Sequence, residues 1–162
     1  AFALCEESGF DPGLKKKILA SVKAGSLDIH TAAFASPTGF PFKVARIPGS
    51  VGDAATYQDR ERVCDLGILR ETYQKPGGGI GFRCPAEPEG AYIAKGGDPA
   101  DTAGRVCMCN SLVASAGIGQ VRHGEEEPPL VTLGDDLEAV RESLLAGSES
   151  YTAAEVVARL LA

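Results

Sequence analysis

The segment between residues 64 and 110 constrains the fold most, because four of the five cysteines of this 162-residue chain lie in it. A proline-glycine turn at 75–79 separates two short runs that are rich in aromatic and β-branched residues. This pattern predicts a β-hairpin with a loose glycine tip. The hairpin would bring Cys64 and Cys84 toward the same end of its two strands.

The cysteines of this segment are candidate metal ligands, because converging thiolates form a tetrahedral site for zinc or hold an iron–sulfur cluster. The candidates are Cys64, Cys84, Cys107 and Cys109. They lack the paired Cys-x-x-Cys spacing of a strong zinc signature. Cys107 and Cys109 are separated by one residue, which suits a tight knuckle. Buried reduced thiols without a metal, or one disulfide with free thiols, remain as alternatives.

Composition excludes several classes of partner. The net charge of -6 argues against a nucleic-acid partner, since a phosphate-binding face needs excess lysine and arginine. No apolar run approaches the roughly 18 residues of a membrane span, so no membrane partner is expected. No segment has the charged and apolar regions of a secretory signal, and the cysteine spacing differs from that of a secreted disulfide framework. We therefore expect a cytoplasmic protein.

The start of the chain predicts one βα unit. Residues 1–4 are apolar and indicate the end of a buried strand. Asp11 has the position of an N-cap with Pro12 at the first helical position, and Gly25 supplies the end of the helix. The lysines at 15–17 are predicted to form a solvated face of this helix. Because the only methionine lies at 108, we expect the chain to be the C-terminal part of a longer protein.

The rest of the chain predicts loops and short elements. Prolines and a glycine exclude regular structure between residues 27 and 43, where Phe40 and Phe42 are expected to anchor an extended loop to the core. Further predictions are a strand at 44–47, a turn at 48–53, short helices near 91–93 and 106–116, a solvated loop at 125–129 and an extended segment at 130–133.

Two amphipathic helices are predicted at the C-terminus. The first has acidic residues 135 and 136 in its first turn and Leu145 among its inward residues. Thr152 and Glu155 form a capping box for the second, whose inward residues include Leu160 and Leu161.

No complete active site is visible in the sequence, and we predict no catalytic residue. His30 and His123 are the only histidines, and neither lies in a recognisable nucleophile setting. The glycine tip at 77–79 lacks the lysine and helix of a phosphate-binding loop.

Several long runs of the chain resemble a bacterial branch of the nitronate monooxygenases, formerly called 2-nitropropane dioxygenases, which are flavin-dependent (β/α)8 proteins. The resembling runs are Ala1–Gly9, Ser36–Lys43, Cys64–Gly67, Arg83–Pro88, Cys107–Asn110 and Glu127–Asp136.

The resemblance implies an α/β fold class. Residues 1–48 would be the end of the flavin-binding (β/α)8 barrel, with its last strand and helix. Residues 49–134 would be a cysteine-containing insert or cap, and residues 135–162 the C-terminal helices. The extension beyond the barrel would be mostly helical, with a cysteine-containing hairpin. FMN would bind over the barrel, as in other proteins of this architecture. Only residues 1–7 and the loop 36–43 would approach the flavin, with Ala1 and Phe2 as candidate cofactor-binding residues.

The resemblance also implies a reaction. The flavin would take electrons from an alkyl nitronate and react with oxygen, yielding a carbonyl compound and nitrite. The partners of the chain would be this small-molecule substrate and the upstream barrel of the same protein. Since no residue here matches the family's catalytic histidine, this part of the protein would be inactive alone. The alternatives are a flavin-dependent enoyl reductase-like protein, or a structural or interaction module with a four-cysteine zinc site.

Overall fold

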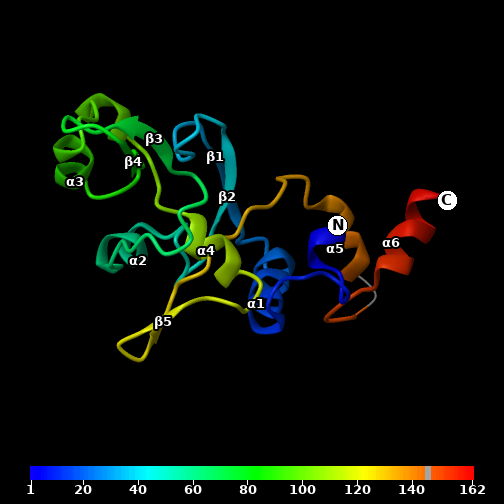
Figure 1. Ribbon diagram of the computed structural model, residues 1–162. Coiled ribbons are helices and arrows are strands. Elements are labelled where there is room, and N and C mark those ends of the chain that lie inside the picture. The colour runs from blue at the N-terminus through cyan, green and yellow to red at the C-terminus, as the bar shows by residue number, and fades with distance from the viewer. Residues whose placement is uncertain (145–146) are drawn as a thin grey trace.

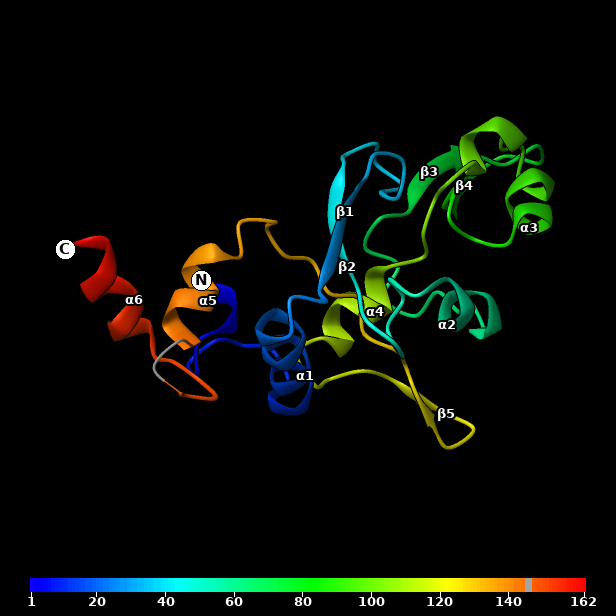
Figure 2. The same ribbon diagram turned by 180° about the vertical axis from the view of Figure 1, so that it is seen from behind.

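The computed structural model describes residues 1–144 and 147–162, which form short helices and small antiparallel sheets. Figures 1 and 2 show the hairpin β3–β4 with α3 at one end of the molecule and α6 at the other, with α1 and the pair β1–β2 between them. The elements are η1 (Phe2–Leu4), α1 (Pro12–Lys23), β1 (Asp28–Ala32), β2 (Phe42–Arg46), α2 (Ala54–Asp59), β3 (Glu71–Gln74), β4 (Ile80–Arg83), α3 (Glu89–Ala94), η2 (Pro99–Thr102), α4 (Cys109–Ala114), β5 (Val121–Arg122), β6 (Glu125–Glu126), α5 (Glu138–Leu144) and α6 (Ala153–Leu160).

The described residues form a mixed α/β structure in which each sheet has two strands and no barrel closes. The extension is less helical than expected, because two β-hairpins, at residues 71–83 and 121–126, contribute to it. The expected strand at residues 1–4 is wrong: Phe2–Leu4 is a 3₁₀-helix. The amide of Leu4 donates to the carbonyl of Ala1 at 3.1 Å, which closes a 3₁₀ turn. In a strand this amide would instead pair with a neighbouring strand.

Helix α1 has the predicted start and end. The carboxylate of Asp11 accepts the amide of Leu14 at 2.8 Å, and Gly25 adopts a φ of +66° just beyond the helix. The predicted solvated lysine face is wrong for Lys15, which is buried. Its ammonium donates to the carbonyls of residues 5, 6 and 8 at 2.9, 2.9 and 3.2 Å, so this lysine holds the preceding loop against the helix.

The segment 28–32 is a strand, which corrects the expectation of a loop from 27 to 43. It pairs with β2 in antiparallel register, from Asp28 opposite Arg46 to Ala32 opposite Phe42. The prolines at 37 and 41 lie in the connection, so their missing amides cost the ladder no hydrogen bond. Phe42 packs against the core as predicted, whereas Phe40 is 69% exposed and anchors nothing.

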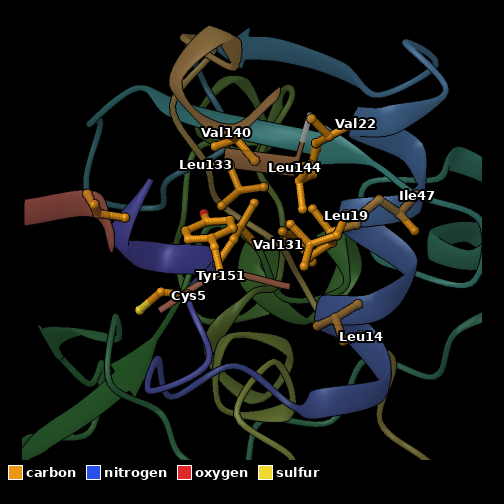
Figure 3. Close-up of a cluster of buried hydrophobic side chains, with 14 residues drawn as sticks. Cys5, Leu14, Leu19, Val22, Ile47, Val131, Leu133, Val140, Leu144 and Tyr151 are labelled. Atoms are coloured by element: carbon orange, nitrogen blue, oxygen red, sulfur yellow. The ribbon is translucent and has the colours of Figure 1, made fainter. Parts of the chain in front are cut away.

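The main hydrophobic core lies between α1, α5 and the extended segment 130–133 (Figure 3). Ile18 and Val22 of α1 are fully buried, as is Val131. The extended segment runs alongside β2, because the amide of Ala45 donates to the carbonyl of Val131 at 3.0 Å. A second, smaller cluster consists of Ala35, Val44, Val51, Met108 and Leu130.

The span from residue 52 to residue 107 has very little core of its own. Its buried residues are Gly81, Pro85, Ala86 and Tyr92, and none of them belongs to either cluster. Arg83 lies against two aromatic rings, with its guanidinium carbon 5.4 Å from the centre of Tyr73 and 5.2 Å from that of Tyr92. Burial this limited rarely stabilises a unit of such size without a covalent or metal cross-link.

The predicted helix at 106–116 is shorter than expected and buries different residues. Helix α4 starts at Cys109, and its buried residues are Asn110 and Ser111. The apolar side chains at 112–114 are only half-buried. The polar face therefore points inward, toward the loops that carry the cysteines.

The C-terminal helices follow the prediction in part. The acidic residues at 135 and 136 precede α5, which begins at Glu138, and the expected inward Leu145 lies outside the described residues. The capping box of α6 is confirmed, with the amide of Glu155 donating to the hydroxyl of Thr152 at 3.2 Å. The predicted inward residues Leu160 and Leu161 are 73% and 82% exposed, because only one side of α6 contacts the rest of the chain.

Candidate metal centre

The four predicted cysteines line one cavity, although they come from separate parts of the chain. Cys64 lies in the loop between α2 and β3, and Cys84 directly follows β4. Cys107 precedes α4, and Cys109 is its first residue. The cavity has a volume of about 30 Å³ and is enclosed mainly by apolar atoms. The hairpin thus has the predicted effect of bringing Cys64 and Cys84 together, and α4 adds the other two thiols.

The thiols influence one another across the cavity. Burial, with a smaller contribution from the neighbouring thiols Cys107, Cys109 and Cys64, raises the pKa of Cys84 to about 11, while a hydrogen bond from the backbone of Ala86 acts in the opposite direction. Burial also raises the pKa of Cys107, while the charge and the hydrogen bond of Arg60 act in the opposite direction. These thiols are therefore protonated at neutral pH, and a metal ion would displace their protons on binding.

A tight turn holds Cys84 in place. The amide of Glu87 donates to the carbonyl of Cys84 at 2.9 Å, and the carboxylate of Glu87 pairs with Lys95 at 2.5 Å. The backbone N–H of Ala86 acts on the Cys84 sulfur itself. This amide favours the thiolate form of Cys84, although burial outweighs its effect in the metal-free chain.

Asn110 fixes the loop that carries Cys64, and sequence reasoning did not single it out. Its side-chain amide donates to the carbonyl of Val63 at 3.0 Å and to the carboxylate of Asp65 at 3.3 Å. Its side-chain oxygen accepts the amide of Leu66 at 3.4 Å. The side chain is 2% exposed. The signal for it was an amide residue directly after the Cys-x-Cys pair, since a buried polar side chain there must satisfy neighbouring backbone groups.

A buried ion pair lies behind Cys107. Nη2 of Arg60 is 2.5 Å from Oε1 of Glu127, and the two side chains are 3% and 2% exposed. The hydroxyl of Ser111 donates to the same carboxylate at 2.6 Å. The expectation that 125–129 is a solvated loop is therefore wrong for Glu127, which sequence reasoning missed because it follows two exposed glutamates.

The four thiols share the cavity without converging on one point. Within residues 1–144 and 147–162, no group of three or more His, Cys, Asp or Glu side chains is arranged to hold a metal ion. All five cysteines are free thiols, so the described chain contains no disulfide. A bound ion would have to draw the sulfurs inward. Cys64 is exposed, and the other three thiols are partly buried. Four thiols are the donor set that zinc prefers, and the ligand chemistry therefore fits this metal.

The predicted cofactor-binding residues lie elsewhere. Ala1 is exposed and Phe2 is 50% exposed, and they precede the loop that Lys15 holds. The loop 36–43 was also expected near a flavin. It is held by Arg105, which donates to the carbonyl of Ser36 at 2.5 Å. Ala1 and Phe2 offer a cofactor only backbone groups and one phenyl ring, and their role in FMN binding stays a prediction.

Comparison with protein-family models, with curated proteins and with solved structures found no match for this chain. In the part of the chain that the structure describes, no helix has the length and apolar character needed to cross a bilayer.

Proposed function

We propose that this chain is a structural metal-binding module in which Cys64, Cys84, Cys107 and Cys109 hold one zinc ion. The observation that carries the proposal is that all four thiols line a single, mainly apolar cavity. Its volume is about 30 Å³, which is enough for one small ion between the thiols. The cavity therefore suits a single ion rather than the several iron and sulfur atoms of a cluster.

The thin packing of residues 52–107 supports a structural role for the ion. This span buries only four residues, none of them in either hydrophobic cluster, and it contacts the second cluster through the partly buried Tyr57, Leu69 and Val106. A tetrahedral ion would join the loop of Cys64, the end of β4 and the start of α4. Such a cross-link supplies the stability that the missing core cannot, as in other small metal-dependent units.

The energetics favour closure of the site around an ion. A structural zinc ion contributes about 10–16 kcal/mol of apparent binding free energy at neutral pH. Moving a side chain about 30° from its rotamer costs only about 0.5–1.5 kcal/mol. The site closes around an ion if drawing the four thiols inward costs less than the free energy of coordination.

Metal analysis of the purified chain tests this proposal. We expect one zinc ion per chain, lost in Cys84→Ser together with a clear fall in the melting temperature. Cys5→Ser is the matched control, because Cys5 is buried in the main core and donates to the carbonyl of Phe2 at 3.2 Å, away from the cavity. A wild-type chain that binds no zinc, or a Cys84→Ser variant with unchanged metal content, would refute the proposal.

The second candidate function is that of the C-terminal part of an FMN-dependent oxidoreductase resembling nitronate monooxygenase. One observation favours it: runs that carry the resemblance contact one another in space. Ser111, next to the run 107–110, bonds Glu127, while Asn110 bonds Asp65 of the run 64–67. The resemblance therefore concerns one packed unit. The metal site and the flavin protein are compatible, since the ion would only stabilise the extension.

The coding sequence that precedes Ala1 tests this second candidate. If it encodes βα repeats that end in a glycine-rich turn, the complete protein should be purified with a flavin absorbance spectrum and should consume oxygen with an alkyl nitronate. An unrelated domain at that place, or a complete protein without flavin, would contradict the assignment. Reduction of an enoyl substrate in place of nitronate oxidation would instead identify the reductase-like alternative.

A further inference from the structure

The guanidinium of Arg60 contacts Cys107, one of the proposed ligands. Arg60 follows the last residue of α2, and its side chain is 3% exposed. Nη1 donates to the carbonyl of Cys107 at 2.7 Å, and Nη2 lies 3.9 Å from the sulfur of the same residue. One side chain therefore contacts both the backbone and the sulfur of Cys107.

A second residue keeps this guanidinium in position. Glu127 is 2.5 Å from Nη2 of Arg60, and it is itself held by the hydroxyl of Ser111 at 2.6 Å and by Arg122 at 3.4 Å. Because these partners restrain the carboxylate, Arg60 cannot turn toward another acceptor without leaving a buried charge unpaired. The orientation of Arg60 toward Cys107 is therefore fixed by the fold and does not depend on a metal.

The charge of the proposed site needs such a partner. Four thiolates around a divalent ion carry a net charge of about −2, and burying it among apolar atoms is costly unless charged donors compensate. A guanidinium that donates to a thiolate sulfur lowers this cost. Among the described residues, no other lysine or arginine hydrogen bond to the sulfur of these four cysteines is present. Arg60 is thus placed to act on one ligand specifically.

We propose that Arg60 is the positioning residue of the metal site: it orients Cys107 and donates a hydrogen bond to the ligand sulfur. This inference rests on the proposed metal-binding function. It predicts that Arg60 controls how tightly the ion is held and how strongly the Cys107 sulfur donates electrons to it. Groups outside the ligand shell that orient a ligand typically change metal affinity by roughly 10–100-fold.

Cobalt(II) substitution tests this role, because sulfur-to-cobalt charge-transfer bands report directly on the ligand sulfurs. The variant R60M/E127Q removes the buried charges together, so that neither is left unpaired. We expect its charge-transfer band to move to longer wavelength, since a sulfur without its hydrogen bond gives up electrons more easily. We also expect release of the ion to a chelator to accelerate by roughly 10–100-fold. R60K keeps the charge but not the planar fork and should release the ion at an intermediate rate.

The control is R46M, which removes an arginine from an exposed pair with Asp28 at 2.9 Å, away from the cavity. Its spectrum and release rate should equal those of the wild type. A general loss of stability would lower the melting temperature of R60M/E127Q without moving its charge-transfer band, and that result would refute the positioning role while leaving the metal site intact. Failure of the wild-type chain to bind cobalt would refute the metal site itself.

Discussion

Lys15→Met should lower the free energy of unfolding, although replacing a lysine on a helix surface usually changes stability little. The ammonium of Lys15 donates to the carbonyls of Cys5, Glu6 and Ser8. Methionine preserves most of the packing of the aliphatic stem but donates nothing, so these carbonyls lose their partner. The carbonyl of Cys5 is buried and cannot recover a hydrogen bond from water, whereas the other two lie nearer the surface.

The magnitude follows from this difference. A hydrogen bond to a charged group contributes about 1.5–3 kcal/mol, and an unsatisfied buried acceptor costs about 1–3 kcal/mol. Removing the buried ammonium also removes its desolvation cost, which offsets part of the loss. We therefore expect the free energy of unfolding to fall by about 2–3 kcal/mol. For a chain of this size the melting temperature should fall by about 4–12 °C.

The assay is urea unfolding followed by circular dichroism, with Lys16→Met as the matched control. Lys16 is adjacent in sequence but exposed, so its replacement should change stability by no more than about 0.5 kcal/mol. If the two variants unfold at the same urea concentration, the hydrogen bonds of Lys15 contribute nothing to the free energy of unfolding and the reasoning is refuted.

Three further predictions concern single contacts. Gly52→Ala should cost about 1–3 kcal/mol by overpacking, because its new Cβ would lie 2.3 Å from the carbonyl oxygen of Ala45; Gly134→Ala, which has open space, should be neutral in the same thermal melt. Tyr151→Phe should cost about 1 kcal/mol, since the hydroxyl donates to the first residue's carbonyl at 2.5 Å, and hydrogen exchange should then quicken at the N-terminus. The pKa of Glu7 is lowered from 4.5 by the hydrogen bond from the first amide of α6. Its stabilisation of that helix is therefore complete above pH 4.5 and is lost as the pH falls through the lowered value; amide shifts in an NMR titration should show this loss, and Glu7→Gln should abolish it.

Local chemistry made parts of the fold predictable. The Asp11-Pro12 start of α1 and the Thr152–Glu155 capping box of α6 satisfy backbone groups within a few residues, so the sequence alone contains both partners. The hairpin β3–β4 was predictable for the same reason, because its glycine tip and its two arms are neighbours along the chain.

Interactions between distant segments were not predictable. Lys15 appears as one of three adjacent lysines, and its burial depends on a loop whose path no local pattern specifies. Glu127 is similar, because its burial requires an ion pair with Arg60, which is far away in sequence. The position of the four cysteines around one cavity was predictable in part, since the hairpin predicted that Cys64 and Cys84 would lie near each other but not that α4 would add the other two.

The two ends of the molecule differ in what stabilises them. Around α1 and α5, fully buried aliphatic side chains such as Ile18 and Val140 exclude water, and the free energy of folding there scales with apolar area. Between residues 52 and 107 that term is small, and the contacts include an ion pair to Glu127, a stacked arginine and thiols around a mainly apolar cavity. Such contacts depend on geometry, because a buried charge or thiol stabilises only when its partner is in place. A metal ion would supply this geometry at one point, and Arg60 would connect that point to Glu127 and, through Ser111, to Leu130 of the second hydrophobic cluster. The metal site would therefore join the polar part of the chain to the part that folds by hydrophobic burial.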